Sequence, residues 1–319
     1  MEHFCTLFDS LFLPQGLSLY SSLQRHAKPF TLWVLCTDDA VHRVLKEMNL
    51  PYLRLISLGQ IENPKLLEVK IGRSSVEYYW TLTPFLLQFV MDLDPSVDRV
   101  TYVDADCWFI NDPRRILQEM DSSGKDVLIT LHDSVVGEEL AKLYGKFAVQ
   151  FMPFRKTKAG LEVLLWWQER CLEWCFARAE HNCFGDQKYL EYWPALFGSS
   201  LHILKNLQLT IGPWNAIRDK DIIDLQAIGC MYHFHNLRIF QGGVVSLCLS
   251  HEYHLPSNVL KVFYQPYLKD LDQNMKAVSK IGFEIPFPSF NPVSLRYNSD
   301  PEAKIHFVVH NFSGFTSLV

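Results

Sequence analysis

Two aspartates separated by a single residue, Asp104 and Asp106, follow a mostly apolar run over 99–103. Such a run predicts a buried strand, and open α/β sheets bind their ligands at the carboxyl ends of strands. Two carboxylates there can share one hard divalent cation, which takes oxygen ligands and often bridges to substrate phosphates. The spacing therefore predicts a cation site that holds a diphosphate. The pattern is short, and paired aspartates also cap turns.

Two histidines, His233 and His235, follow the apolar run 228–232 and are also separated by one residue. Strand spacing would place both imidazoles on one face. A neutral imidazole can complete a cation site begun by two carboxylates, especially for Mn²⁺, which accepts oxygen and nitrogen donors. We expect one of the two to bind the cation, and the alternative for either is a hydrogen-bonded core histidine.

Two loops carry further polar side chains that could face a ligand. Asp186 and Gln187 follow a glycine, where Asp186 either caps a helix over 187–192 or lies at a reacting group. Trp214 and Asn215 lie in a turn rigidified by proline. They could stack on and hydrogen-bond a sugar, or the tryptophan could simply pack the loop.

The elements that must position these residues alternate between strand and helix. We expect strands over 4–8, 30–36, 52–56, 99–103, 126–131 and 147–152, and helices over 17–26, 40–48, 77–91 (interrupted at Pro84), 161–177 and 259–281. The β-α-β-α-β opening predicts a parallel sheet with right-handed crossovers. Asp9, just beyond the first strand, would lie on the same sheet edge as the aspartate pair, as a base or ribose contact or as a cap.

The predicted fold class is therefore α/β, with a mixed, mostly parallel sheet flanked by helices. We expect one domain over residues 1–255. Residues 256–319 would form a helical and extended C-terminal extension packed on it, because this region combines one long helical pattern with a proline-rich tail.

Composition excludes some classes of protein. The 319 residues are 48% hydrophobic and 20% charged, which is typical of a globular protein with a large core. A formal net charge of −5 argues against a broad nucleic-acid-binding surface. The eight cysteines form no Cys-x-x-Cys pair, which favours free thiols in a reducing cytoplasm. We expect no signal peptide or transmembrane helix, while peripheral membrane contact and oligomeric state stay open.

Taken together, four segments resemble the nucleotide-sugar transferases of the GT-A fold, and within them glycosyltransferase family eight and related bacterial enzymes. The segments are Thr6-Leu-Phe-Asp9 with the helix after it, Val100-Thr-Tyr-Val-Asp-Ala-Asp106, Gly185-Asp-Gln187 and His233-Phe-His-Asn236. They occur in the family's order and span about residues 3–240. The Asp-x-Asp segment in its strand context is the more specific of the four.

The resemblance implies a metal-dependent glycosyltransferase that moves a sugar from a nucleoside-diphosphate sugar, expected to be a UDP-sugar, to an acceptor hydroxyl with retention. The acceptor would be a carbohydrate, a lipid-linked sugar or a protein. Mn²⁺ or Mg²⁺ would be bound by Asp104 and Asp106 with His233 or His235, and Asp186 and Gln187 would be the catalytic residues. The donor would contact Thr6, Phe8, Asp9, Ala105, Gln150, Trp214, Asn215 and Arg238.

One departure from the family concerns the charge that meets the diphosphate. The family's histidine motif would place a lysine at Ile239, and the neighbouring Arg238 is the candidate substitute. Two other classes remain open on the sequence. One is an Asp-x-Asp phosphohydrolase, although Trp108 stands where that class has threonine. The other is a non-catalytic module that binds a nucleotide sugar.

Overall fold

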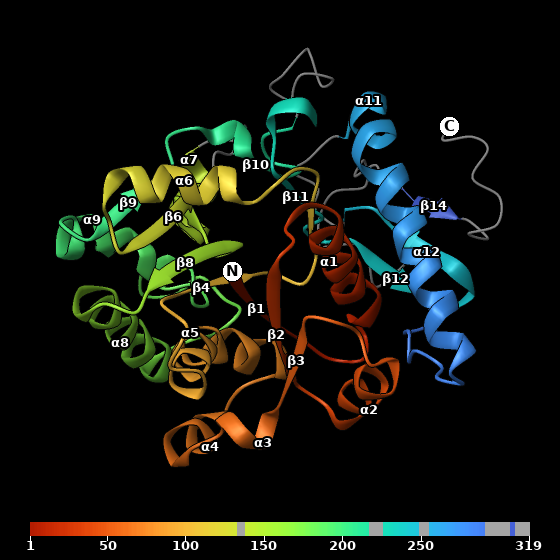
Figure 1. Ribbon diagram of the computed structural model, residues 1–319, viewed down its shortest axis with the longest axis horizontal. Helices are drawn as coiled ribbons and strands as arrows, with labels where there is room; N and C mark the ends of the chain where they lie inside the picture. Colours follow the sequence, from red (N-terminus) through yellow and green to blue (C-terminus); the bar gives the residue numbers. More distant parts are fainter. Residues whose placement is uncertain (133–137, 217–225, 249–254, 291–306, 310–319) are drawn as a thin grey trace.

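A central sheet runs through the computed structural model, which describes residues 1–132, 138–216, 226–248, 255–290 and 307–309 (Figure 1). Four strands pair in parallel in the order β3-β2-β1-β4: β1 (Glu2–Phe8), β2 (Phe30–Cys36), β3 (Leu53–Ser57) and β4 (Arg99–Val103). Beyond β4 the sheet continues with β8 (Phe151–Arg155), β6 (Val127–Leu131) and β7 (Phe147–Ala148), all in antiparallel pairings, while β9 (Leu201–Ile203) pairs in parallel with β6. The predicted mixed, mostly parallel sheet is confirmed.

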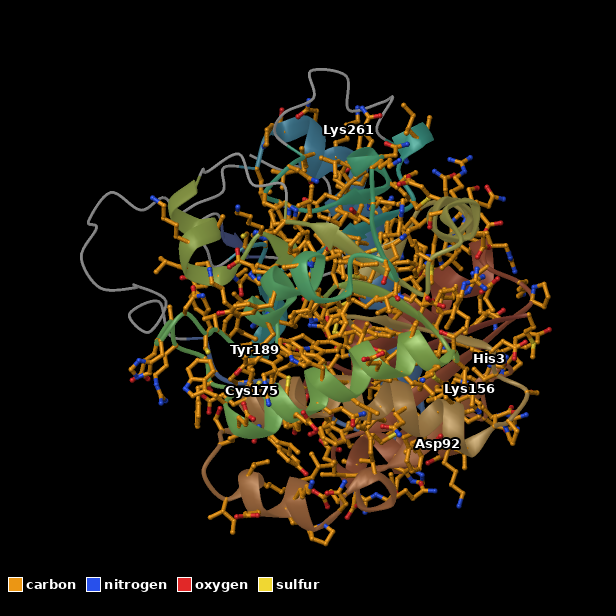
Figure 2. All side chains as sticks on the ribbon, turned by 90° about the vertical axis from the view of Figure 1, so that its left-hand side faces the viewer. His3, Asp92, Lys156, Cys175, Tyr189 and Lys261 are labelled. Atoms are coloured by element: carbon orange, nitrogen blue, oxygen red, sulfur yellow. The ribbon has the colours of Figure 1, made fainter. Side chains whose placement is uncertain are left out.

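Helices cover both faces of this sheet. One face packs against α1 (Leu13–His26), α2 (Asp39–Met48) and α6 (Arg114–Ser123). The other packs against α3 (Leu58–Ile61), α4 (Pro64–Lys70), α5 (Ser75–Leu93) and α8 (Lys158–Glu173). Figure 2 shows α8 of this second face, which runs from near Lys156 to near Cys175. Because both faces are buried, the strands read as nearly continuous apolar runs rather than as alternating ones.

The local sequence explains where several helices begin. Asp38 caps α2 by accepting from the Val41 amide at 2.7 Å. Helix α1 begins at Leu13, four residues before the expected start, because Pro14 fits a first helical turn. Helix α5 begins at a reciprocal cap between Ser74 and Glu77.

Three expectations about elements on the second face were wrong. Helix α5 continues through Pro84 without interruption, held by burial of its neighbours. The single strand expected over 147–152 is divided into β7 and β8, and α8 ends at Glu173 rather than at residue 177. In each case tertiary packing overrides the local sequence signal.

The remaining elements form a smaller region around the carboxyl ends of the strands. A three-stranded sheet joins β5 (Cys107–Phe109), β11 (Met231–His233) and β10 (Thr210–Ile211), and a second joins β12 (Arg238–Phe240), β13 (Val244–Ser246) and β14 (Phe307–Val309). The helical segments are α7 (Glu138–Tyr144), η1 (Lys188–Tyr192), α9 (Trp193–Phe197), η2 (Leu207–Leu209), η3 (Gln241–Gly243), α11 (Ser257–Val259), the π-helical turn η4 (Leu260–Tyr264) and α12 (Gln265–Lys280).

Helix α12 ties the C-terminal extension to the sheet domain, and in Figure 1 it lies beside α1. The indole of Trp108 in β5 donates to Asp270 of α12 at 2.7 Å, and Arg25 of α1 pairs with the same carboxylate at 2.5 Å. Residues between 211 and 247 share one core with residues 255–271. The domain boundary at residue 255 stays a prediction, and most of the expected extended tail lies outside the described residues.

None of the helices in the described part of the chain is both long and apolar enough to cross a bilayer. The eight cysteines are free thiols, and Cys183 is the partly exposed member of an otherwise buried set.

Candidate functional site

The turn that carries the two aspartates is tied to three neighbouring segments. It begins where β4 ends at Val103 and ends where β5 begins at Cys107. The Asp104 amide donates to the Gln150 carbonyl at 3.2 Å, and the Phe234 amide donates to the Asp106 carbonyl at 2.9 Å. The backbone therefore fixes the aspartate turn against both the start of β8 and the end of β11.

His233, the last residue of β11, points its imidazole at both aspartates. Its Nε2 lies 3.0 Å from Oδ1 of Asp106 and 3.8 Å from Oδ2 of Asp104. The side chain of Asp104 is 29% exposed, against 13% for Asp106 and 9% for His233. The three groups form one cluster, and Asp104 is its most exposed member. The structure thus brings together three of the residues predicted as metal ligands.

The opposite charges in this cluster shift its ionisation. Burial favours the neutral acid, but the adjacent His233 imidazolium outweighs it and lowers the pKa of Asp106 to about 2. Burial lowers the pKa of His233, yet the attraction of Asp106 and Asp104 raises it overall. For Asp104, burial raises the pKa, and its distance from the imidazole leaves that effect dominant. The ligand-free cluster therefore holds a proton between His233 and the carboxylates.

Gln150 determines which nitrogen of His233 faces the aspartates. Its Oε1 lies 3.0 Å from His233 Nδ1, and its Nε2 lies 3.5 Å from the Thr130 hydroxyl. An Nδ1–H that donates to this amide directs Nε2 at the carboxylates, where it carries the shared proton. A metal that displaced this proton would meet the Nε2 lone pair, in the tautomer that binds metals. Gln150 is 1% exposed. The structure places it behind the histidine, and its predicted contact with the donor stays a prediction.

Tyr102 supports the other aspartate, and the sequence reading missed it. Its hydroxyl donates to Oδ1 of Asp104 at 2.9 Å. Residues two apart in a strand share a face, so the position of Tyr102 before Asp104 was the signal that could have found it.

Cys107 also lies near the cluster, and its sulfur, an Asp106 oxygen and a His233 nitrogen lie within 4.8 Å of one another. Burial and the two nearby carboxylates raise the pKa of the Cys107 thiol well above its usual value. The thiol contacts the Gln150 carbonyl at 3.8 Å. A protonated soft ligand does not suit Mg²⁺ or Mn²⁺, so Asp104 is the better third ligand.

His235 lies beside the cluster and contacts it through aromatic rings. Its ring centroid lies 5.5 Å from that of His233 and 6.0 Å from that of Trp214. Burial and the charge of His233 lower the pKa of His235 to about 3, so it stays neutral. Both histidines therefore offer nitrogen, but His233 is the one whose Nε2 contacts Asp106 and Asp104, so it is the stronger candidate ligand.

Trp214 and Asn215 pack and hydrogen-bond the loop that carries them. Trp214 is 1% exposed and packs on the rings of His233, His235 and His132. The Asn215 side chain accepts from the Gly212 amide and donates to the Thr210 carbonyl. The loop-packing alternative thus describes both residues in this structure, and their contact with a sugar stays a prediction.

Asp186 is not a helix cap. The helical turn η1 begins after Gln187 and has no side-chain cap. Asp186 is buried near Thr83, and burial together with the charge of Asp104 raises the pKa of Asp186 to about 8. Gln187 donates from Nε2 to the Tyr144 carbonyl at 2.9 Å. The charge of Asp104 therefore acts on the buried Asp186 carboxyl group. The amide nitrogen of Gln187 is held by the Tyr144 carbonyl at the end of α7.

The first strand ends near the expected nucleotide contacts. Thr6 and Phe8 are buried in β1, and Ala105 is buried between the aspartates. Asp9 accepts from the Leu11 and Phe12 amides through Oδ1. Burial raises its pKa. Asp9 thus caps the turn with one carboxylate oxygen.

Arg238 lies on the other side of the cluster. Its guanidinium lies 5.3 Å from the ring centroid of Phe12 and donates to the Leu237 carbonyl at 2.9 Å. Its charge helps to lower the pKa of Asp106. One of its five N–H groups is occupied by that carbonyl, so others can meet a phosphate.

No protein-family model matches the chain. The chain is 34% identical over 217 residues to the uncharacterised protein YfnF of Bacillus subtilis (strain 168), which is 66% of this chain and 71% of YfnF. It is 26% identical over 318 residues to YfnD of the same organism, also uncharacterised, covering 96% of this chain and 98% of YfnD.

Several solved glycosyltransferases are similar in structure. The bifunctional enzyme WbbM superposes with a TM-score of 0.53 at 14% identity, over 88% of this chain and 51% of that one. The galactosyltransferase LgtC, solved with donor and acceptor sugar analogues, gives 0.51 at 12% over 86% and 99%. GlyE of Streptococcus pneumoniae TIGR4 gives 0.51 at 16% over 90% and 65%.

At these identities the likeness to solved structures shows the fold, and the predicted GT-A fold is confirmed. The chain belongs to the family of Bacillus subtilis YfnF and has the GT-A fold of glycosyltransferases.

Proposed function

We propose that the protein is a metal-dependent glycosyltransferase that moves a sugar from a nucleoside-diphosphate sugar to an acceptor hydroxyl. One observation carries the proposal: His233 Nε2 faces Asp106 at 3.0 Å and Asp104 at 3.8 Å at the carboxyl end of β4. In open α/β sheets this edge binds ligands. The GT-A fold shared with several glycosyltransferases supports the same function.

The chemistry of the donor set fits a divalent cation. Two carboxylates and an imidazole whose other nitrogen faces Gln150 offer oxygen and nitrogen ligands of the kind that Mn²⁺ accepts, and Mg²⁺ is the alternative. Asp104, Asp106 and His233 would hold the ion. When bound it supplies a Lewis acid for the charge that develops on the leaving nucleoside diphosphate.

Arg238 would share the charge of that diphosphate. It stands next to the position where the related family has its lysine, and its charge already acts on Asp106. A guanidinium binds phosphate oxygens with two parallel N–H groups, so it can replace a lysine there. Asp9 would contact the nucleoside through the carboxylate oxygen that does not cap its own turn.

Asp186 and Gln187 would lie at the transferred sugar. With a pKa of about 8, Asp186 is mainly protonated at neutral pH and can donate a hydrogen bond to a sugar oxygen. The Gln187 amide, fixed at one end by the Tyr144 carbonyl, can present its oxygen to a sugar hydroxyl. Retention at the anomeric carbon follows from the resemblance described above.

The finer assignments are a UDP-sugar donor, a carbohydrate, lipid-linked or protein acceptor, and a cytoplasmic location. The first two follow from the resemblance. The third is supported by eight cysteines that remain free thiols, as in reducing compartments.

A thermal-shift panel tests the proposal. Nucleoside diphosphates and nucleotide sugars are added with and without Mn²⁺, because a ligand that binds the folded state raises the melting temperature. We expect one nucleotide to give a shift that requires Mn²⁺, and we expect Asp106→Asn to lose it. The matched control is Asp92→Asn, an exposed aspartate of α5 (Figure 2).

Turnover is then measured with the sugar nucleotide that the panel selects, as release of nucleoside diphosphate. Metal-dependent release by the wild type that is lost in Asp106→Asn supports a transferase. Binding without release on any donor would instead support the non-catalytic module. A nucleotide shift that survives both in Asp106→Asn and without metal would overturn the metal role.

A further inference from the structure

Helix α5 covers the turn that carries Asp186 and Gln187. The ring centroid of Trp80 in α5 lies 5.9 Å from that of Phe184, and a Cβ atom at Gly185 would lie 3.0 Å from Cε3 of Trp80. Gly185 also has a φ of +51°, in the left-handed region that favours glycine. The helix therefore approaches the backbone of this turn as closely as a residue without a side chain allows.

The backbone of the turn is fixed from two further segments. The Gly185 amide donates to the Phe176 carbonyl at 3.0 Å, and the indole of Trp167 in α8 donates to the Asp186 carbonyl at 2.9 Å. These bonds hold the main chain, but neither of them orients the Asp186 carboxyl group. That side chain is buried, so neighbouring side chains inside the protein orient it.

Thr83 is the side chain of α5 that reaches this carboxyl group. It lies three residues after Trp80, and therefore on the same face of the helix. It is buried, and its hydroxyl interacts with the Asp186 carboxyl group and with the Tyr102 hydroxyl. Its contact with the Tyr79 carbonyl is long, at 3.5 Å. The hydroxyl of Thr83 thus connects two functional groups from different segments.

Tyr102 extends this connection to the aspartate cluster. Its hydroxyl donates to Oδ1 of Asp104 at 2.9 Å. Burial, together with the charges of Asp104 and Asp186, raises the pKa of Tyr102 well above its usual value, so the phenol keeps the proton that it donates. With Oδ1 held by the phenol, Oδ2 is the oxygen that faces His233, at 3.8 Å. Tyr102 therefore selects which oxygen of Asp104 points into the cluster.

We propose that Tyr102 and Thr83 are positioning residues, whose two hydroxyls form a bridge that holds Asp104 and Asp186 in a fixed relation. The inference rests on the proposed function, in which Asp104 acts at the diphosphate of the donor and Asp186 at the transferred sugar. Misplacing a reacting group by about 1 Å can lower a rate by about 10²-fold, so a bridge between these two carboxyl groups has a large effect on transfer.

Two buried residues elsewhere in the protein provide matched controls. Thr101 lies next to Tyr102 in β4 and points to the opposite face of the strand. Its hydroxyl has no hydrogen-bond partner in the part of the chain that the structure describes. Tyr20 of α1 donates from its hydroxyl to the Pro51 carbonyl at 3.0 Å. Thr101→Val and Tyr20→Phe therefore remove buried hydroxyls of the same kinds without touching the bridge.

Metal binding tests the Asp104 end of the bridge. Mn²⁺ alone is titrated into the wild type and the two tyrosine variants, and the free ion is measured by electron paramagnetic resonance. We expect Tyr102→Phe to weaken Mn²⁺ binding by about tenfold, since substitutions behind a metal ligand typically cost about 10–100-fold in affinity. Tyr20→Phe should bind as the wild type does. Equal Mn²⁺ affinity in the two variants would overturn the role of Tyr102.

Turnover tests the Asp186 end of the bridge. The kcat and KM are measured with the sugar nucleotide that the thermal-shift panel selects. We expect Thr83→Val to lower kcat by between about tenfold and 10²-fold with little change in KM, because the hydroxyl acts where the sugar is transferred. Thr83→Ser keeps the hydroxyl and should restore most of kcat, and Thr101→Val should match the wild type. A loss in Thr83→Ser as large as that in Thr83→Val would assign the effect to packing and overturn the bridge.

The double variant that combines Tyr102→Phe with Thr83→Val tests whether the two hydroxyls act as one unit. Either substitution breaks the bridge, so the loss of turnover in the double variant should be smaller than the product of the two single losses. Urea denaturation checks that each variant is folded. Losses that simply multiply would mean that the two residues act separately, and the bridge would be wrong.

The two proposals fail in different ways. A wild type with no metal-dependent nucleotide shift and no turnover on any donor would overturn the proposed function and the bridge together. A wild type that shows both, while Tyr102→Phe and Thr83→Val behave like their controls, would overturn the bridge alone. Reduced Mn²⁺ affinity in Tyr102→Phe and reduced kcat in Thr83→Val, beside unchanged controls, would support both proposals.

Discussion

Two regions adjoin the same 186–188 segment but treat buried charge in opposite ways: the aspartate cluster and a cavity that we call the lysine pocket. The floor of the lysine pocket is the buried pair of Lys188 and Glu191, and its exposed rim carries Lys146. In the cluster, Asp104 and Asp106 share one imidazole, and Asp186 nearby is driven toward its neutral form. In the pocket, the buried ammonium of Lys188 has two carbonyls and a carboxylate as partners. On the proposed function a cation would complete the first arrangement, whereas the second has its partners within the protein.

This difference predicts which substitutions should mainly affect activity and which should mainly affect stability. Crowded like charges cost folding free energy and persist at sites where a cation or substrate restores the balance. A charge pair with all its hydrogen bonds satisfied instead holds segments together. We therefore expect substitutions in the cluster to change activity more than stability, and substitutions of the pocket floor to do the reverse.

The largest expected effect is that of Asp106→Asn on turnover. The substitution keeps the size of the side chain but removes the carboxylate closest to His233. Removing one group that stabilises developing charge typically lowers kcat by about 10²–10³-fold, and we expect a loss of that order in nucleotide-sugar turnover. The free energy of unfolding without metal is measured by urea denaturation. An unfolded variant, or turnover equal to that of the wild type, would contradict the expectation that the cluster serves activity more than stability.

The pocket floor should behave in the opposite way. Lys188→Met keeps the aliphatic part of the side chain but removes the ammonium that pairs with Glu191 and donates to the Ala141 and Lys142 carbonyls. We expect the free energy of unfolding to fall by about 2 kcal/mol, below the range for a fully buried pair because Glu191 is partly exposed. Lys146→Met, on the exposed rim, is the control and should change stability by less than about 0.5 kcal/mol. Equal effects of the two substitutions would contradict a structural role for Lys188.

How far the sequence predicted these two regions depends on what positions them. The aspartate turn and His233 were both predicted because an apolar run precedes each of them and indicates a buried strand that ends at polar side chains. The antiparallel pairing of β11 with β5, which brings the two together, was not predicted. The lysine pocket was not predicted. It joins residues near 142 and 188 through side-chain contacts with carbonyl oxygens, and such contacts leave no periodic pattern in the sequence.

The same reasoning explains the supporting contacts that the sequence did not indicate. Gln150 was predicted to contact the donor, which stays a prediction, and the break between β7 and β8 also places its amide against His233. The contact of Trp108 with Asp270 joins residues 162 positions apart. Only the folded chain brings such residues together. Tyr102, in contrast, could have been predicted from sequence, because residues two apart in a strand point to the same face.

Helix α12 offers a way to sharpen the comparison, because it supports the aspartate cluster without contacting its charged groups. Trp108 donates to Asp270, and Phe234, between the two histidines, stacks on Tyr267 with ring centroids 3.6 Å apart. Asp270→Leu should release Trp108 and weaken Mn²⁺ binding by about tenfold, the lower end of the effect of outer-sphere substitutions.

Mn²⁺ affinity for this variant is measured by electron paramagnetic resonance of the free ion, a readout independent of turnover. Asp272→Leu on the same helix is the control. The Asp272 carboxylate pairs with Lys276, which lies two turns of α12 beyond Tyr267, the aromatic neighbour of the cluster. If both leucine variants bind Mn²⁺ equally, α12 does not position the cluster.

A pH-dependent gain in stability is expected for Asp186→Asn. Asp186 has a folded-state pKa of about 8, above the unfolded value of about 3.9, so the folded protein keeps a proton that the unfolded chain loses. The stability that this proton contributes is complete below the unfolded pKa and is lost as pH rises through the folded pKa. Asparagine carries no titrating group, so the melting temperature of Asp186→Asn should exceed that of the wild type by more at about pH 8 than at about pH 5. The exposed control Asp92→Asn should show no such trend, and a difference for Asp186→Asn that is constant with pH would mean that its carboxyl group is not held neutral by burial and Asp104.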